Sequence, residues 1–470
     1  MNRSRKAAET VRSRRLGESV FVVLAVVVSE VIILSHAETG VFVPVAFGVA
    51  MSLFIAAKAL LADTLRFSYW TIPSFFMLMY LALMPYGAIV TFVEMDHPMR
   101  YTYLLAVLSV LVTFPIGVAL ANSILTRPST VIRRYVRSQL VAAPTDRQFA
   151  PTFFALLLLG IPILTMYLGY SEHVQLLEVI KKYPTNIDAV TLKFSGADDL
   201  PRMVQYSFEV LRRFILPLCV LFAYLMASTG RRSWQIAFWP LLVGGLFVSA
   251  LTLDRAPPVA FLVMLVLGYI LRTPQSLAKA FSNVRLLSIM TLAMIVGGIV
   301  SVLQYQSEFT SDSVISSAAY VLKYRILQDA PYMASTAFET FNESTGFLYG
   351  KYMRIFSLMP GFEYVESSDT IYSPAAPVGF VGDLWRNFGW PGVILGTVLI
   401  GFAYQTIQVK LFVRKTVFML SIHVILLIGS IWIIHGNVLG VMSTSVMVLA
   451  TVAGAYARQD RAGSAGLRRV

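Results

Sequence analysis

The chain alternates between long apolar runs and short polar turns along most of its length. Each run is close to the roughly 20 residues that an α-helix needs to cross the hydrocarbon core of a bilayer. The runs predict membrane spans at 19–35, 41–62, 71–93, 102–125, 152–171, 210–228, 235–253, 257–271, 286–303, 389–409, 417–435 and 438–457. The eighth run is short, but Pro257 and Pro258 at its start suit a first helical turn, whose amides have no partner within the helix. The pattern predicts an all-α, polytopic integral membrane protein with about twelve transmembrane helices.

Composition indicates the same class. Of the 470 residues, 57% are hydrophobic and 13% are charged, whereas roughly 25% are charged in ordinary soluble proteins. This excludes a water-soluble globular enzyme. The net charge of +13 does not indicate nucleic-acid binding, because the basic residues lie in the turns between apolar runs. One cysteine, Cys219, lies within an apolar run, and the five histidines show no metal-ligand spacing, so we expect neither a disulfide framework nor a metal site.

The distribution of charge predicts the orientation in the membrane. With the N-terminus inside, 25 of the 38 Lys and Arg fall inside and 19 of the 25 Asp and Glu fall outside, giving net charges of +20 and −6. This follows the positive-inside rule, so both termini are predicted to be cytoplasmic. The predicted organisation is a basic N-terminus (1–18), nine spans (19–303), a large outer loop (304–388), three spans (389–457) and a cytoplasmic tail (458–470). Alternatively, the first run is a cleaved signal peptide, since Ser35-His36-Ala37 resembles a small-residue cleavage site.

Two outer loops are longer than the other connections, at 172–209 and 304–388. Loops of this length within a compact fold are usually functional. The second loop is rich in Tyr, Phe and Pro, whereas disordered linkers are poor in aromatic residues. We therefore expect this loop to form an ordered extracytoplasmic cap that contains short helices.

Positive charge on the outer side runs against the orientation rule and marks candidate binding residues. Arg255 is the strongest candidate among them, because it lies in the tight turn Thr252-Leu253-Asp254-Arg255 between two spans. An equally good interpretation is that Arg255 is a turn residue whose charge is solvated at the membrane interface. Other outer cations are Arg202, Arg212, Arg213, Lys323, Arg325, Lys351, Arg354 and Arg386. A single arginine of this kind is usually a solvated or acid-paired surface residue. The set favours a docking surface for an anionic headgroup, because guanidinium groups match phosphate oxygens in pairs.

The order of residues from 320 to 401 is the most specific feature of the chain. It includes Tyr324-Arg325, then Leu348-Tyr349-Gly350-Lys351-Tyr352-Met353, then Ser357-Leu358-Met359-Pro360, and finally Pro377-Val378-Gly379-Phe380-Val381-Gly382-Asp383-Leu384-Trp385-Arg386-Asn387-Phe388-Gly389-Trp390-Pro391-Gly392 before an apolar helix. This order resembles the bacterial oligosaccharide repeat-unit polymerases, the Wzy-like class that includes O-antigen polymerases. The chain departs from the family at Gly361-Phe362-Glu363-Tyr364, where Lys-Pro is frequent, and it lacks an Arg-x10-Gly repeat.

The resemblance implies a metal-independent membrane glycosyltransferase of GT-C-like architecture that uses no cofactor. It would act on undecaprenyl-diphosphate-linked glycans at the outer face of the inner membrane, in surface polysaccharide biosynthesis. A diphosphate is already a good leaving group, so arginines that neutralise its developing charge can replace a general acid. The acceptor hydroxyl still benefits from a general base, most plausibly an outer carboxylate.

On this interpretation Asp383 is the base or orients the acceptor hydroxyl, and Arg255 and Arg325 bind the diphosphate. An equally good interpretation of Asp383 is a helix-end carboxylate that stabilises the tenth span through the helix dipole. The predicted substrate-binding residues are Arg354, Lys351, Arg386, Trp385, Tyr324 and Arg202, of which Trp385 would stack on a sugar face. The expected partners are lipid-linked glycans, membrane lipids, a chain-length regulator and a flippase, with no nucleic acid.

Two alternative functions compete with polymerisation. An O-antigen ligase shares the large-loop plan but uses a different acceptor. A lipid-linked oligosaccharide flippase or secondary transporter is less favoured, because two six-helix halves would normally be joined by a long inside loop and residues 229–234 are short.

Overall fold

The computed structural model describes residues 70–94, 99–141, 144–170, 201–230, 232–252, 256–272, 329–349 and 379–436, together with the single residues 48 and 454. These residues form helices, and the one extended pairing among them is an isolated bridge between Val141 and Thr416. Seven segments are long and apolar enough to cross a membrane, which indicates a helical membrane protein. They are Ile72–Val93, Arg100–Ile124, Phe149–Gly169, Met203–Ser228, Arg232–Ala250, Gly379–Leu411 and Val417–His435.

Eight of the twelve predicted spans coincide with helices of the structure. In chain order, all of the described helices are α3 (Ile72–Leu83), α4 (Pro85–Glu94), α5 (Arg100–Ile124), α6 (Pro128–Arg137), α7 (Pro144–Gly169), α10 (Arg202–Val210), the π-helical turn η4 (Leu211–Ile215), α11 (Leu216–Ser228), α12 (Arg232–Ala250), α13 (Ala256–Arg272), α17 (Asp329–Thr340), α18 (Gly379–Leu411) and α19 (Val417–His435). The spans predicted at 19–35, 41–62, 286–303 and 438–457 lie outside the described residues. The count of twelve therefore stays a prediction.

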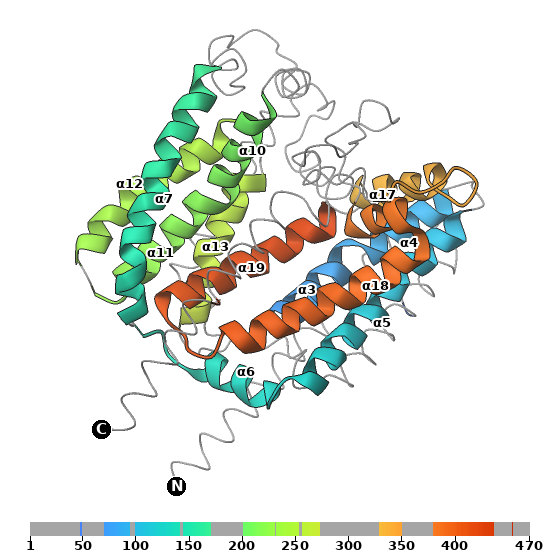
Figure 1. Ribbon diagram of the computed structural model, residues 1–470, viewed down its shortest axis with the longest axis horizontal. Helices are drawn as coiled ribbons and strands as arrows, with labels where there is room; N and C mark the ends of the chain where they lie inside the picture. Colours follow the sequence, from blue (N-terminus) through green and yellow to red (C-terminus); the bar gives the residue numbers. More distant parts are fainter. Residues whose placement is uncertain are drawn as a thin grey trace, which may run out of the picture.

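The helices lie in two groups with α19 between them (Figure 1). One group holds α3, α4, α5, α17 and α18, and the other holds α7, α10, α11, α12 and α13. α19 contacts α3 and α18 in the first group and α11 and α13 in the second. Its sequence is strongly apolar and almost all of its residues are buried, as expected for a helix that other helices surround.

α5 and α18 form the most extensive contact among the described helices. A Cβ atom on Gly117 would lie 2.0 Å from a carbonyl oxygen of α18, and one on Gly401 would lie 2.3 Å from the Phe114 carbonyl oxygen. The two backbones touch, which requires glycine at both positions, and small residues are the usual means of close helix packing in membranes. Further along both helices, Gln405 Nε2 donates to Asn122 Oδ1 at 2.5 Å. α5 and α18 run in the same direction (Figure 1).

The structure adds detail to two predicted helix limits. Ile72–Val93 is one apolar span, as predicted, and it is interrupted between α3 and α4 at Pro85, because proline has no amide hydrogen and its ring clashes with the preceding turn. The span predicted to begin at residue 389 begins at the break in α18 at Gly389, and residues 379–388 form a separate helical piece before it. Within the large outer loop, α17 confirms the expectation of short helices.

Charged residues separate between the two ends of the bundle. One end, which we call the basic end, is where α6 lies and where α7 and α19 begin (Figure 1). By their positions in the elements, the described charged residues of this end are Arg127, Arg133, Arg134, Arg137, Arg147, Arg232, Arg272, Lys410, Arg414 and Lys415, with Asp146 as the one described acid. The other end, which we call the α17 end, is where α17 lies and where α5 and α18 begin (Figure 1). The described charged residues of this end are Glu94, Arg100, Arg202, Glu209, Arg212, Arg213, Asp329, Glu339, Glu343, Asp383 and Arg386. This separation agrees with the predicted loop assignment, in which the basic end faces the cytoplasm.

Candidate functional site

A break in α18 at Gly389 shapes the α17 end. Gly389 has φ 60° and ψ −146°, a conformation that is strained for residues with a side chain. A Cβ atom on Gly392 would lie 2.5 Å from the Leu384 carbonyl oxygen, whereas eight residues of continuous helix span about 12 Å. Residues 379–388, which we call the short arm, therefore fold back against the long part of α18.

Two distant chain segments meet at the end of the short arm. The Leu348 amide donates to the Arg386 carbonyl oxygen at 2.9 Å, and the Tyr349 amide donates to the Asn387 carbonyl oxygen at 3.0 Å. These carbonyls lie in the last turn before the break, where a helix leaves its oxygens without intrahelical partners. The segments that carry the family resemblance are thus joined to each other by backbone hydrogen bonds.

The short arm carries a buried ion pair. Asp383 Oδ1 accepts hydrogen bonds from Arg386 Nη2 at 2.7 Å and from Arg386 Nε at 3.0 Å. The Asn387 side-chain amide donates to the Asp383 carbonyl oxygen at 2.8 Å. Asp383 is 1% exposed and Arg386 is 3% exposed. Residues three apart share a helix face, so this carboxylate is satisfied by its own helix and enclosed by protein.

Trp385 fixes the short arm to α17. Its ring stacks on Phe338 with centroids 4.2 Å apart and an interplanar angle of 14°, and its Nε1 donates to the Phe341 carbonyl oxygen at 2.7 Å. The edges of Phe347 and Trp390 complete the cluster, with ring centroids 5.9 Å from Trp385. Trp385 is 4% exposed. Stacking of this indole on a sugar would therefore require Phe338 to move.

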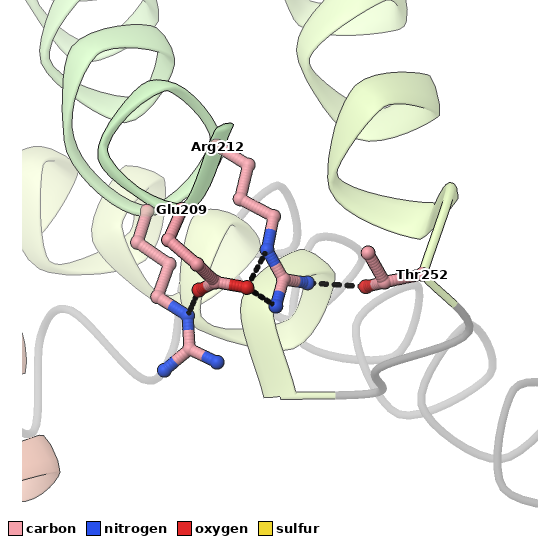
Figure 2. Close-up of polar contacts among 4 residues, drawn as sticks. Glu209, Arg212 and Thr252 are labelled. Carbon is pink, nitrogen blue, oxygen red and sulfur yellow. Dashed lines mark hydrogen bonds and ion pairs between the residues drawn. The ribbon is translucent and has the colours of Figure 1, made fainter. Parts of the chain in front are cut away.

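A second charged cluster lies where α10 continues into the π-helical turn (Figure 2). Arg212 Nε donates to Glu209 Oε1 at 2.9 Å, its Nη2 binds the same oxygen, and its Nη1 donates to the Thr252 hydroxyl oxygen. Arg213 Nε binds the other carboxylate oxygen, Oε2. One carboxylate is held between two guanidinium groups. π-helical turns occur frequently at functional sites.

The two arginines of this cluster differ in access to solvent. Arg212 is 2% exposed, and its bond to Thr252 ties the end of α10 to the end of α12. The Arg213 side chain is 23% exposed, and its guanidinium carbon lies 4.8 Å from the ring centroid of Trp432 on α19. Arg212 is thus an anchor, and Arg213 is the guanidinium that an approaching anion can reach.

The π-helical turn and the start of the short arm both border the C-terminal end of α19. Arg213 packs on Trp432. A Cβ atom on Gly379, where the short arm begins, would lie 3.1 Å from the Ile434 carbonyl oxygen. Trp432 and Ile434 are two residues apart in α19. Segments from the two helix groups are therefore brought to one helix end at the α17 end of the bundle.

Three of the predicted site residues, Asp383, Trp385 and Arg386, lie together on the short arm. Arg202 begins α10, the helix that carries Glu209. The remaining predicted site residues, Arg255, Tyr324, Arg325, Lys351 and Arg354, lie outside the described residues.

Sequence reasoning identified Arg212 and Arg213 as outer cations but missed Glu209. A signal for it was present, because a glutamate followed at the third and fourth positions by arginines has the spacing of ion pairs on one helix face. The partner Thr252 could not be found in this way, since it is 40 residues further along the chain.

The described residues contain no group of three or more His, Cys, Asp or Glu side chains that could hold a metal ion. No protein-family model, curated protein or solved structure matches the chain. The functional assignment therefore depends on the residues and contacts given above.

Proposed function

We propose that this protein polymerises undecaprenyl-diphosphate-linked oligosaccharide repeat units at the outer face of a bacterial inner membrane. The observation that supports the proposal is the junction of the two motif segments, where Leu348 and Tyr349 bond the end of the short arm. These are the segments that resemble repeat-unit polymerases. The short arm begins beside the same end of α19 that the Glu209, Arg212 and Arg213 cluster borders.

In the proposed reaction, the bond between the anomeric carbon of the growing chain and the lipid diphosphate breaks. A hydroxyl oxygen of the incoming lipid-linked repeat unit forms the new glycosidic bond, and its proton passes to a base. The lipid diphosphate leaves as an anion, whose charge preorganised arginines stabilise. Arg213 is proposed for this role because its side chain is 23% exposed, whereas Arg212 is 2% exposed and Arg386 is 3% exposed. Arg255, Arg325, Arg354 and Lys351 are proposed to complete the diphosphate site.

The burial of Asp383 favours a positioning role for this residue over the role of general base. A base must come within hydrogen-bond distance of the acceptor hydroxyl, and Asp383 is 1% exposed with Arg386 on its Oδ1. We propose that the Asp383 and Arg386 pair holds the short arm in shape, so that its end can bind residues 348 and 349.

Deletion of the gene followed by analysis of the lipid-linked glycans tests the function. Single repeat units that accumulate on the outer face are expected for a polymerase. Completed chains that remain unattached would indicate a ligase, and repeat units that stay on the inner face would indicate a flippase or transporter. Either of these outcomes would overturn the proposal.

The orientation is tested separately with single introduced cysteines. The native Cys219 is free and buried, and it is replaced by serine so that the introduced cysteine is the one thiol that can be labelled. Ser344 and Gln139 are exposed at the α17 end and the basic end, respectively. An impermeant maleimide applied to intact cells should label Ser344→Cys and leave Gln139→Cys unlabelled. The reverse pattern would place the proposed site on the cytoplasmic side.

A further inference from the structure

The helix α6 lies across the basic end of the bundle, between the ends of α5 and α7 (Figure 1). Ile132 and Tyr135 are each 1% exposed and face the bundle. Arg134 and Arg137 are exposed on the other side of the helix. A short helix with a covered apolar face and arginines on its outer face is suited to lie in the plane of a membrane interface.

The loop between α18 and α19 holds α6 in place. Lys415 Nζ donates to the Val136 carbonyl oxygen at 3.0 Å, and the ammonium lies 5.4 Å from the Tyr135 ring centroid. Just after α6, the Val141 amide donates to the Lys415 carbonyl oxygen at 3.1 Å. The helix that carries these arginines is therefore held in place before a ligand binds, so less conformational entropy is lost on binding.

The exposed charged side chains that the structure describes around α6 are all cationic. The exposed cations at the basic end include Arg127, Arg134, Arg137, Arg147, Lys410 and Arg414. Asp146, the one described acid at this end, is buried, and its carboxylate accepts the Phe418 amide at 2.9 Å at the start of α19. No described carboxylate is therefore exposed beside these cations.

An exposed apolar strip leads along α5 to the arginines. Ile116, Leu120 and Ile124 are 47%, 48% and 72% exposed on the last turns of α5, and α6 begins four residues after Ile124. An apolar strip that ends at a cluster of arginines matches a molecule with an acyl chain and an anionic head. A soluble phosphate would use the arginines alone.

We propose that α6 and the last turns of α5 bind anionic phospholipids of the leaflet at the basic end. The phosphodiester contacts the guanidinium groups of Arg134 and Arg137, and the acyl chains lie along Leu120 and Ile124. Guanidinium groups suit this ligand because their planar forks match phosphate oxygens. The proposal does not depend on the function proposed for the α17 end.

Purified full-length protein in a zwitterionic detergent tests the site, with thermal unfolding followed as phospholipid is added. Dioleoyl phosphatidylglycerol should stabilise the protein at lower concentrations than dioleoyl phosphatidylcholine. In the Arg134→Gln/Arg137→Gln variant, the apparent affinity for phosphatidylglycerol should fall about 25-fold, since each cation near an anionic membrane surface contributes about 5-fold.

The matched control is Arg232→Gln, which removes an exposed arginine at the basic end from α12. It should change the affinity by less than about 2-fold, because Arg232 lies on another helix away from α6. Equal melting temperatures of all variants without added lipid will show that the arginines are not needed for folding. Equal stabilisation by both lipids, an equal loss in the control, or the same stabilisation by inorganic phosphate would each overturn the proposal.

Discussion

Two carboxylate and arginine clusters at the same end of the bundle share a helical spacing but differ in exposure. On the short arm, Asp383 pairs with Arg386 three residues later, and both are almost fully buried. In α10, Glu209 pairs with Arg212 at the same spacing, but Arg213 adds a second cation whose side chain is 23% exposed. In the second cluster, Glu209 binds both arginines, one through each carboxylate oxygen.

This difference separates structural from ligand-binding arginines. A buried guanidinium is out of reach of a ligand, and removal of its partner carboxylate is costly in the interior. A partly exposed guanidinium can exchange one of its contacts for a phosphate oxygen. The following changes should distinguish these roles.

The largest effect is expected from Asp383→Asn. It removes the carboxylate that binds the buried Arg386 guanidinium, and breaking a buried ion pair costs about 3 to 5 kcal/mol in free energy of unfolding. Thermal unfolding in detergent should show a large loss of stability. The double variant Asp383→Leu/Arg386→Met removes both charges and should recover most of the stability. A stable Asp383→Asn protein with greatly reduced turnover would instead return Asp383 to the role of general base.

The buried cation Lys415 should make the stability of the protein depend on pH. Its described partners are the Val136 carbonyl and the Tyr135 ring. Burial lowers the pKa of Lys415 to about 8, from 10.5. The folded protein then loses this proton at lower pH than the unfolded chain does, so stability should rise from about pH 8 to 10.5. Each pKa unit corresponds to about 1.4 kcal/mol.

Melting temperatures of wild type and Lys415→Met at pH 7.5 and pH 10 measure this effect. Wild type should gain stability relative to the variant at the higher pH, because the variant has no proton to lose at this position. A constant difference between the two proteins would show that Lys415 is charged equally in the folded and unfolded states.

Arg213→Lys should reduce polymer formation by purified protein on lipid-linked repeat units by about 10-fold to 150-fold. Lysine keeps the charge but loses the planar fork, and a hydrogen bond to a charged group contributes about 1.5 to 3 kcal/mol. Arg100→Lys is the matched control, since Arg100 also stacks on aromatic rings at the α17 end, 5.5 Å from the Phe92 centroid. Unchanged turnover in Arg213→Lys would remove this arginine from the diphosphate site.

The smallest effect is expected from Trp385→Phe. Phenylalanine can keep the stacking on Phe338 but cannot donate to the Phe341 carbonyl oxygen. The lost hydrogen bond should lower the free energy of unfolding by about 0.5 to 1.5 kcal/mol, with turnover retained. A large fall in turnover at nearly unchanged stability would favour sugar stacking by Trp385.

Hydropathy alone predicted most of the described helices. Eight predicted spans coincide with them because the length of an apolar run is a local property that the thickness of the bilayer sets. The breaks within helices were harder to predict from the sequence. Proline is a recognisable helix breaker at Pro85, whereas the reversal of the chain at Gly389 depends on how Leu384 packs against Gly392.

The sequence also determined which residues were candidates, since an outer cation is unusual wherever it lies along the chain. Only the tertiary structure separated them. Asp383 and Glu209 each have an arginine three residues later, and this spacing alone does not indicate which pair is buried. Their burial and their distant contacts, with α17 beside Trp385 and with Thr252 beside Arg212, come from segments far along the chain. Exposure depends on what packs over a residue, and that is decided when the helices assemble.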